Sequence, residues 1–155
     1  MEKIKMPEEL KREIRFSDIY VSVKQFIPDV KYTELKIAMD EVDLDELFTK
    51  AMERVKVREW RGEPIGRARS AAEVRKAHGL DKNDLAYLVY VDDRPVLFQP
   101  HNPFNPLESK LTRGNIERVM EEHRKRVAFS LMRRDLTDVV VQHILRYREE
   151  SGERR

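Results

Sequence analysis

The chain has 155 residues, which is enough for one domain with a substantial core. Charged residues make up 39% and cysteine is absent, so disulfides, a thiolate nucleophile and a cysteine zinc site are excluded. Both charge signs are abundant and glycine is scarce, a composition typical of hyperthermophile proteins rich in ion pairs. The chain lacks an apolar run of about 18 residues and a charged-then-apolar leader, so we expect neither a membrane span nor a secretory signal.

The charge is segregated along the chain although the net charge is only +2. Residues 33–53 hold seven acids and two bases, whereas residues 54–76 hold eight bases and three acids. Residues 113–134 are again basic, with seven bases and three acids. Local fields rather than the total charge therefore decide what binds, and a basic segment suits phosphate. In the alternative, the acidic and basic segments are ordinary solvent-exposed surfaces that bind no ligand.

Residues 1–15 read as a basic N-terminal arm. Pro7 followed by acids makes a good first helical turn, and Lys11, Arg12 and Arg15 supply positive charge. We expect a short helix that ends near Arg15.

A β-hairpin is predicted next. Ile19, Val21 and Val23 alternate with Tyr20, Ser22 and Lys24, a period of two that favours a strand over 18–27. The alternation over 35–39 favours the return strand, although the same residues also fit a helix.

Two helices are predicted in the middle of the chain. Asp43 and Glu46 have the spacing of a capping box, and the apolar residues of 44–55 then share one face. Ser70 caps a short second helix, which Gly79 closes.

A second hairpin follows these helices. Residues 86–91 form an apolar run, Asp92 and Asp93 make a turn, and 95–98 return as the second strand. The proline-rich residues 99–107 then predict a stiff, extended connector.

Residues 111–147 predict one long helix, because the segment has no proline and only one glycine, Gly114. Its apolar residues follow one stripe from Ile116 to Leu131 and then change to the opposite side. We favour a continuous helix whose second half contacts another subunit; the alternative is a break at Asp135. The residues assigned to this subunit interface are Phe129, Met132, Leu136, Val140, His143 and Tyr147.

These elements predict a single domain of residues 1–155 that is helix-rich α+β. One or two β-hairpins pack with helices, and a long C-terminal helix occupies 111–150. A nearly all-α fold is the alternative.

The arginine-rich loop 58–69 is the best candidate binding site. Its arginines match phosphate oxygens, and Trp60 could stack a base. In the alternative, Trp60 closes the core and the arginines pair with the acids of 33–53. The residues expected to contact nucleic acid are Lys11, Arg12, Arg15, Arg58, Trp60, Arg61, Arg67, Arg69, Arg124, Lys125 and Arg126.

A metal-dependent nuclease is a further alternative. Asp29, Glu34 and Lys36 resemble the signature of restriction-enzyme-like nucleases, but two acids five residues apart on one strand lie about 16 Å apart, too far to share an ion. Asp93 with Glu108 and Lys110 is a second partial match. The four histidines are scattered along the sequence, so we expect no metal site. The sequence also has no serine in a nucleophile elbow and no glycine-rich phosphate loop, so we expect no catalytic residue and no cofactor.

The order of elements resembles the major coat proteins of filamentous viruses of hyperthermophilic archaea. The resemblance is carried by the basic arm (1–15), the helical middle (44–77) and the long C-terminal helix. It implies paired related subunits that wrap duplex DNA, in a virion. The hairpins with a C-terminal pairing helix resemble instead the atypical single-stranded DNA-binding proteins of some crenarchaea. Both resemblances imply a nonenzymatic protein that coats DNA as a homo- or hetero-oligomer. Its expected location is a virion or the cytoplasm. The opposing hypothesis is a protein–protein adaptor that does not bind DNA.

Overall fold

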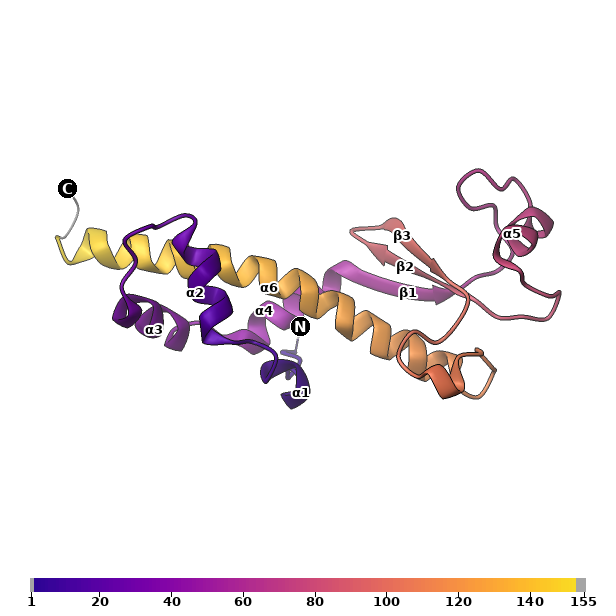
Figure 1. The fold of residues 1–155 in the computed structure, drawn as a ribbon, viewed down its shortest axis with the longest axis horizontal. Coiled ribbons are helices and arrows are strands. Elements are labelled where there is room, and N and C mark those ends of the chain that lie inside the picture. The colour runs from indigo at the N-terminus through magenta and orange to yellow at the C-terminus, as the bar shows by residue number, and fades with distance from the viewer. Residues whose placement is uncertain (1, 153–155) are drawn as a thin grey trace. The chain divides into compact units, whose positions relative to one another are not determined.

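A computed structural model describes residues 2–152 and shows a helix-rich α+β fold with a small sheet (Figure 1). Its elements in chain order are α1 (Glu8–Lys11), α2 (Phe16–Lys24), α3 (Tyr32–Asp40), α4 (Leu44–Arg54), β1 (Val55–Glu59), α5 (Ala71–His78), β2 (Tyr87–Val91), β3 (Arg94–Gln99), η1 (Pro106–Glu108) and α6 (Ile116–Glu150). The predicted fold class and the long C-terminal helix are confirmed.

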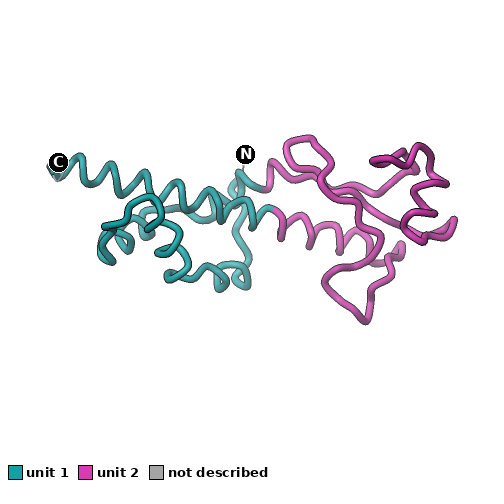
Figure 2. The backbone as a smooth tube through the Cα atoms, turned by 45° about the horizontal axis from the view of Figure 1, so that its top comes forward, with its two compact units in different colours: residues 1–51, 128–155 teal, residues 52–127 magenta. Residues whose placement is uncertain are grey.

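The chain divides into two compact units, which the sequence analysis did not anticipate (Figure 2). Unit 1 comprises residues 1–51 and 128–155, and unit 2 comprises residues 52–127. Helices α4 and α6 each contribute residues to both units.

The regular elements in the described part of unit 1 are all helices, so the predicted hairpin over 18–27 and 35–39 is wrong. Helices α2 and α3 pack against the C-terminal half of α6 (Figure 1). In α2, Ile19 and Val23 are buried four residues apart, while Val21 between them is 64% exposed. The β-branched residues that suggested a strand have only a weak intrinsic preference against helix, and packing on α6 overrides it.

The predicted subunit interface is also wrong for its apolar residues. Phe129, Met132, Leu136 and Val140 are buried by the chain itself. Leu136 and Val140 share a core with residues of α2 and α3, such as Val23. The second half of α6 needs no partner chain to cover this face, because the N-terminal helices cover it. Helix α6 is continuous at Asp135 as well.

The other two predicted interface residues differ from this group. His143 is half-buried, and its Nδ1 lies 3.2 Å from a carboxylate oxygen of Glu41. Tyr147 is 44% exposed. Neither belongs to the apolar core of unit 1.

An ion pair joins the last turns of α6 to the start of α3 in unit 1. Arg148 donates to both carboxylate oxygens of Glu34, at 2.7 and 2.9 Å, and to Asp29 at 3.1 Å. Glu34 is buried, and the hydrogen bonds from Arg148 hold the pKa of its carboxyl below its ordinary value. This pair fixes the turn between α2 and α3 against the C-terminal helix.

Unit 2 contains a three-stranded antiparallel sheet in the order β1-β2-β3. The predicted second hairpin is confirmed, with Asp92 and Asp93 at positive φ in its turn. Strand β1 was not predicted: the helix was extended to Val55, but α4 ends at Arg54 and the next five residues pair with β2.

Both faces of β2 are covered, which explains its uninterrupted apolar sequence. Tyr87 is fully buried, and its hydroxyl lies 2.7 Å from Nδ1 of His123 on α6. The neighbouring residue Leu88 points to the other face, where it packs with Trp60 and with Val74 of α5. Burial raises the pKa of Tyr87 and lowers that of His123, so both groups stay neutral at pH 7.

The caps of the two middle helices are as predicted. The Asp43 carboxylate accepts from the Glu46 N–H at 3.1 Å, and the Ser70 hydroxyl accepts from the Glu73 N–H at 3.2 Å. Gly79 ends α5 in the left-handed conformation, with φ of 64°.

The burial of Leu136 within its own chain is testable by substitution. We expect Leu136→Ala to lower the free energy of unfolding by about 3 kcal/mol, because it leaves a cavity in the core of unit 1. Denaturant unfolding should give the same loss at two protein concentrations that differ by about tenfold. A loss that shrinks on dilution would instead place Leu136 at a subunit contact. Val21→Ala, at an exposed position of the same unit, is the control and should change stability by less than about 0.5 kcal/mol.

The ion pair of Glu34 predicts an acid-sensitive part of the stability. Arg148 lowers the pKa of Glu34 in the folded protein below the ordinary value of 4.5. The ion pair therefore contributes fully to the free energy of unfolding above pH 4.5, and this contribution is lost as the pH falls through the folded pKa. Arg148→Met should cost about 3 kcal/mol at pH 7, since it leaves a buried carboxylate unpaired. The difference between wild type and variant should shrink as the pH falls below 4.5 and through the lowered pKa of folded Glu34, because protonation of the carboxylate removes the ion pair. Arg134→Met, which removes an exposed arginine of α6, should show no such pH dependence.

Candidate functional site

The Trp60 side chain is buried, so it is not accessible for stacking on a nucleic-acid base as the sequence suggested. Trp60 directly follows β1, and its backbone N–H donates to the Ala86 carbonyl at 2.8 Å. The side chain is only 7% exposed, and its indole N–H donates to the Glu63 carbonyl at 2.9 Å. Trp60 therefore belongs to the core of unit 2, as the alternative reading proposed.

Arg58 is likewise an internal group rather than an open phosphate ligand. Its guanidinium donates to the Glu63 carboxylate at 3.1 Å and to the Tyr90 hydroxyl at 2.7 Å. Its charge is balanced by Glu63, so it is not offered to a ligand.

The rest of the loop is exposed. Residues Ile65 and Ala68 exchange two backbone hydrogen bonds, of 3.1 and 3.0 Å, and this closes a tight turn with Gly66 and Arg67 at its tip. Gly66 has a φ of 58°, a conformation that favours glycine. Arg61, Arg67 and Arg69 are exposed, and none of their side chains forms an ion pair within residues 2–152. These three predicted residues remain available to an anion.

A cavity of about 390 Å³ lies in unit 2, where the loop after β1 meets α5 and the loop before β2. Its lining residues are Glu59, Trp60, Arg61, Gly62, Arg75, Lys82, Asn83, Asp84, Leu85 and Arg113. Four of them are cationic and two are acidic.

The ion pairs of this cavity leave it positively charged. Arg113 lies 2.7 Å from the Glu59 carboxylate, and Lys110 lies 3.7 Å from that of Asp84, so both acids of the lining already have a cation. Arg61, Arg75 and Lys82 have no carboxylate partner in the described part of the chain. An anion is therefore the ligand that the charge of this cavity favours.

Arg75 is the most specific feature of the cavity. Its guanidinium carbon lies 5.4 Å from the centroid of the Trp60 ring, so the buried indole supports the arginine by a cation–π contact. The Nε atom of Arg75 is buried without a hydrogen-bond partner in the described protein. An unsatisfied buried donor on a cation is costly, and no carboxylate among the described residues offsets the charge of this guanidinium.

Two residues of the site were missed from the sequence. Arg75 and Lys82 fall in the short helix and the following turn, where charged residues usually cover a solvated surface. Only the fold shows that they share a cavity with Arg61.

The basic triplet of α6 does not form an open binding surface. Arg124 donates to the Val55 and Met52 carbonyls at 2.9 and 3.0 Å, so it caps the end of α4 and the start of β1. Arg126 has an interaction partner of its own, and Lys125 is half-buried. Arg124 therefore binds backbone carbonyls of its own unit, and its expected contact with nucleic acid stays a prediction.

The N-terminal arm is attached to α4 within unit 1. The Met6 N–H donates to Asp45 at 2.8 Å, and the Ile4 N–H donates to the Thr49 hydroxyl at 2.6 Å. Lys11 lies 3.6 Å from Asp45, so its charge is already paired. Arg12 and Arg15 are exposed; residue 1 lies outside the described residues.

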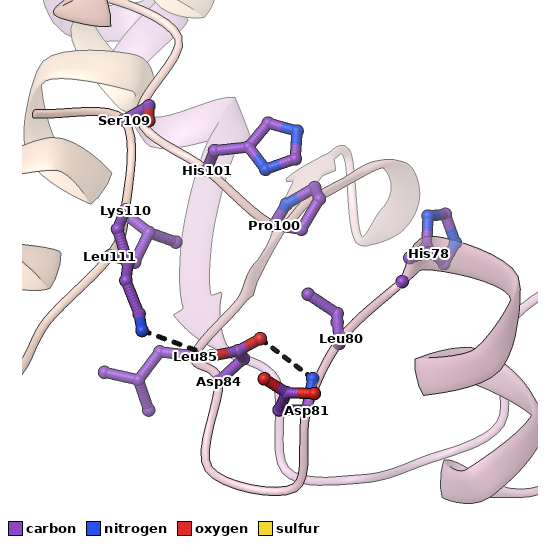
Figure 3. A pocket seen from close by; sticks show the side chains of 11 residues that line it. His78, Leu80, Asp81, Asp84, Leu85, Pro100, His101, Ser109, Lys110 and Leu111 are labelled. Carbon is purple, nitrogen blue, oxygen red and sulfur yellow. Dashed lines mark hydrogen bonds and ion pairs between the residues drawn. The ribbon is translucent and has the colours of Figure 1, made fainter. Parts of the chain in front are cut away.

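A second cavity, of about 260 Å³, brings His78 and His101 together with acids (Figure 3). Its Asp84 carboxylate is engaged by Lys110 and by the Asp81 N–H, at 3.7 and 2.8 Å. Within residues 2–152, no three acid or histidine side chains are placed to hold a metal ion.

The acids considered for a nuclease also lie in ion pairs. Asp29 and Glu34 both bind Arg148, which occupies the position between them. The Glu108 carboxylate lies 2.7 Å from Arg118, whose hydrogen bond lowers the pKa of Glu108. Asp93 pairs with Lys56 at 3.0 Å. These acids stabilise the fold of their own units.

Comparisons with protein-family models, curated proteins and solved structures find no match to this chain. No helix among the described residues is long and apolar enough to cross a membrane.

Anion binding at the cavity can be followed through Trp60, the only tryptophan. We expect pyrophosphate to change the tryptophan fluorescence, because the anion would neutralise the arginine stacked on the indole. Arg75→Met should weaken pyrophosphate binding about tenfold or more, since it removes a charge-assisted donor. Lys76→Met removes an adjacent exposed charge of α5 that does not line the cavity, and should leave the affinity unchanged. A wild-type fluorescence that does not respond to pyrophosphate would contradict the assignment.

Proposed function

We propose that the protein is a nonenzymatic DNA-binding protein that contacts the phosphate backbone with unit 2 and coats DNA in a multi-subunit assembly. The observation that carries the proposal is the group of unpaired cations, Arg61, Arg75 and Lys82, around one cavity. Arg67 and Arg69 extend this group along the exposed loop. Backbone contacts of this kind are made by arginine and lysine and carry most of the affinity of coating proteins.

The position of Trp60 favours duplex DNA as the ligand. Proteins that bind single strands without sequence preference use exposed aromatic residues as stacking platforms. The one tryptophan of the basic loop is buried and already hydrogen-bonded, so it supports an arginine instead of a base. Recognition through phosphates alone suits a duplex, whose bases are already stacked.

A binding role also accounts for the acids better than a nuclease role does. Asp29, Glu34 and Glu108 serve as partners for arginines of their own units. The viral coat assignment implied by the order of elements remains part of this proposal.

The salt dependence of DNA binding tests the proposed function. We expect the logarithm of the affinity for a duplex to fall linearly with the logarithm of the salt concentration. Replacing Arg61, Arg67 and Arg69 together by alanine should weaken binding to all sequences similarly and reduce the slope by about 2 to 3, because up to three phosphate contacts are lost.

Lys36→Ala is the matched control for this measurement, because Lys36 is an exposed cation of unit 1 outside the basic loop. It should leave the slope unchanged. Absence of duplex binding even at low salt would refute the proposal. Tighter binding to single strands than to duplex would keep the protein among DNA-coating proteins but overturn the choice of ligand.

A further inference from the structure

Helix α6 has a second face in unit 1 that the described residues of the unit leave largely exposed. Gln142 lies at the centre of this face, with Asp138 one turn before it and Arg146 one turn after it. All three side chains are exposed, and within residues 2–152 neither Asp138 nor Arg146 forms an ion pair. This is not the face that packs against α2 and α3, whose residues include Leu136 and Val140.

The face also has apolar character. Leu145 is 45% exposed, and Val139, on the other side of Gln142, is half-buried. A shallow, almost wholly apolar hollow of about 260 Å³ lies along α6; its lining residues are Asp138, Val139, Gln142, His143 and Arg146. Exposed apolar surface on one helix face is a feature of helix-pairing surfaces.

We propose that this face binds the same face of a second copy of the chain, as an antiparallel pair of α6 helices about a two-fold axis at Gln142. In such a pair, residues equally far from Gln142 in opposite directions face each other. Asp138 and Arg146 are each four residues from Gln142, so every Asp138 faces an Arg146 of the other copy. Val139 and Leu145 are each three residues away, so an apolar pair forms on each side of the axis.

The charge pattern is therefore self-complementary in the antiparallel arrangement. A parallel pair would bring Asp138 against Asp138 and Arg146 against Arg146, which is unfavourable. The occupant inferred from this pattern is a second copy rather than an unrelated partner, because the same helix face carries both the acid and the base, and each copy then supplies one member of each ion pair.

The pairing is expected to be weak and reversible. The face from Asp135 to Glu149 is about 21 Å long at 1.5 Å per residue, which is small compared with interfaces that bury 1,200 Å² or more. Asp135 and Glu149 would also face each other at its ends, and like charges oppose the contact. Both of these acids have interaction partners within the chain.

Charge reversal tests the register as well as the dimer. The full-length protein should form a dimer at about 100 μM in sedimentation equilibrium at low salt. Asp138→Arg and Arg146→Asp should each raise the dimer dissociation constant about tenfold or more, because two attractions become two repulsions. Mixing the two variants should restore dimers. In the mixed dimer, positions 138 and 146 of one chain are both arginine and those of the other chain are both aspartate, so each facing pair again has opposite charges.

The double variant Asp138→Arg with Arg146→Asp should also dimerise like wild type, and it keeps the test valid if either single variant folds poorly. Glu117→Arg, at an exposed position in the first turn of α6, is the control and should not affect association. Three results would overturn the proposal: a wild-type protein that stays monomeric at about 500 μM, dimers indifferent to both reversals, or single variants that fail to combine. Because the assay contains no DNA, its outcome is independent of the proposed DNA binding.

Discussion

The structure depends on the burial of α6, a helix too long to be covered by one layer. Isolated helices are marginal in water, so its 35 residues need apolar partners along their length. The apolar stripe changes face between Val119, which is buried in unit 2, and Leu136, which is buried in unit 1. Two parts of the chain cover this helix: the sheet contacts the first half of α6 through Tyr87 in unit 2, and α2 and α3 cover the second half in unit 1.

Arginine has two separate roles in this protein, and the fold decides which arginine has which role. Arg58, Arg124 and Arg148 bind carboxylates or backbone carbonyls and hold segments together. Arg61 and Arg75 line a cavity in which the acids already have partners. The near balance of total charge therefore conceals a local excess, because most acids neutralise structural cations rather than the exposed loop. The buried Trp60 connects the two roles, since it is a core residue that also supports Arg75.

Much of the fold was predictable where local signals and tertiary packing agree. The caps at Asp43 and Ser70 and the turn at Asp92 set boundaries that do not depend on distant residues. Strand β1 was not predictable in the same way, because Val55 continues the apolar face of α4 and only pairing with β2 makes it extended. The hairpin predicted over 18–27 failed because the alternation of β-branched residues there was weaker than the force of burying Ile19 and Val23. The site was half predictable: the sequence marks a basic loop, but charge alone does not distinguish a paired arginine from an unpaired one.

Phosphate binding in unit 2 and helix pairing in unit 1 would reinforce each other in a coating protein. A single cavity with a few cations gives modest, salt-sensitive affinity for a phosphate backbone. A dimer carries two copies of that cavity, and once one copy is bound the second meets the same DNA at a high effective concentration, provided that the linkage allows both to engage. Weak pairing through α6 is then sufficient, because DNA itself concentrates the subunits along its length. Assembly would therefore be favoured on DNA over free solution, and the low affinity of the helix pair would keep most of the DNA-free protein monomeric at concentrations well below those at which the helices pair.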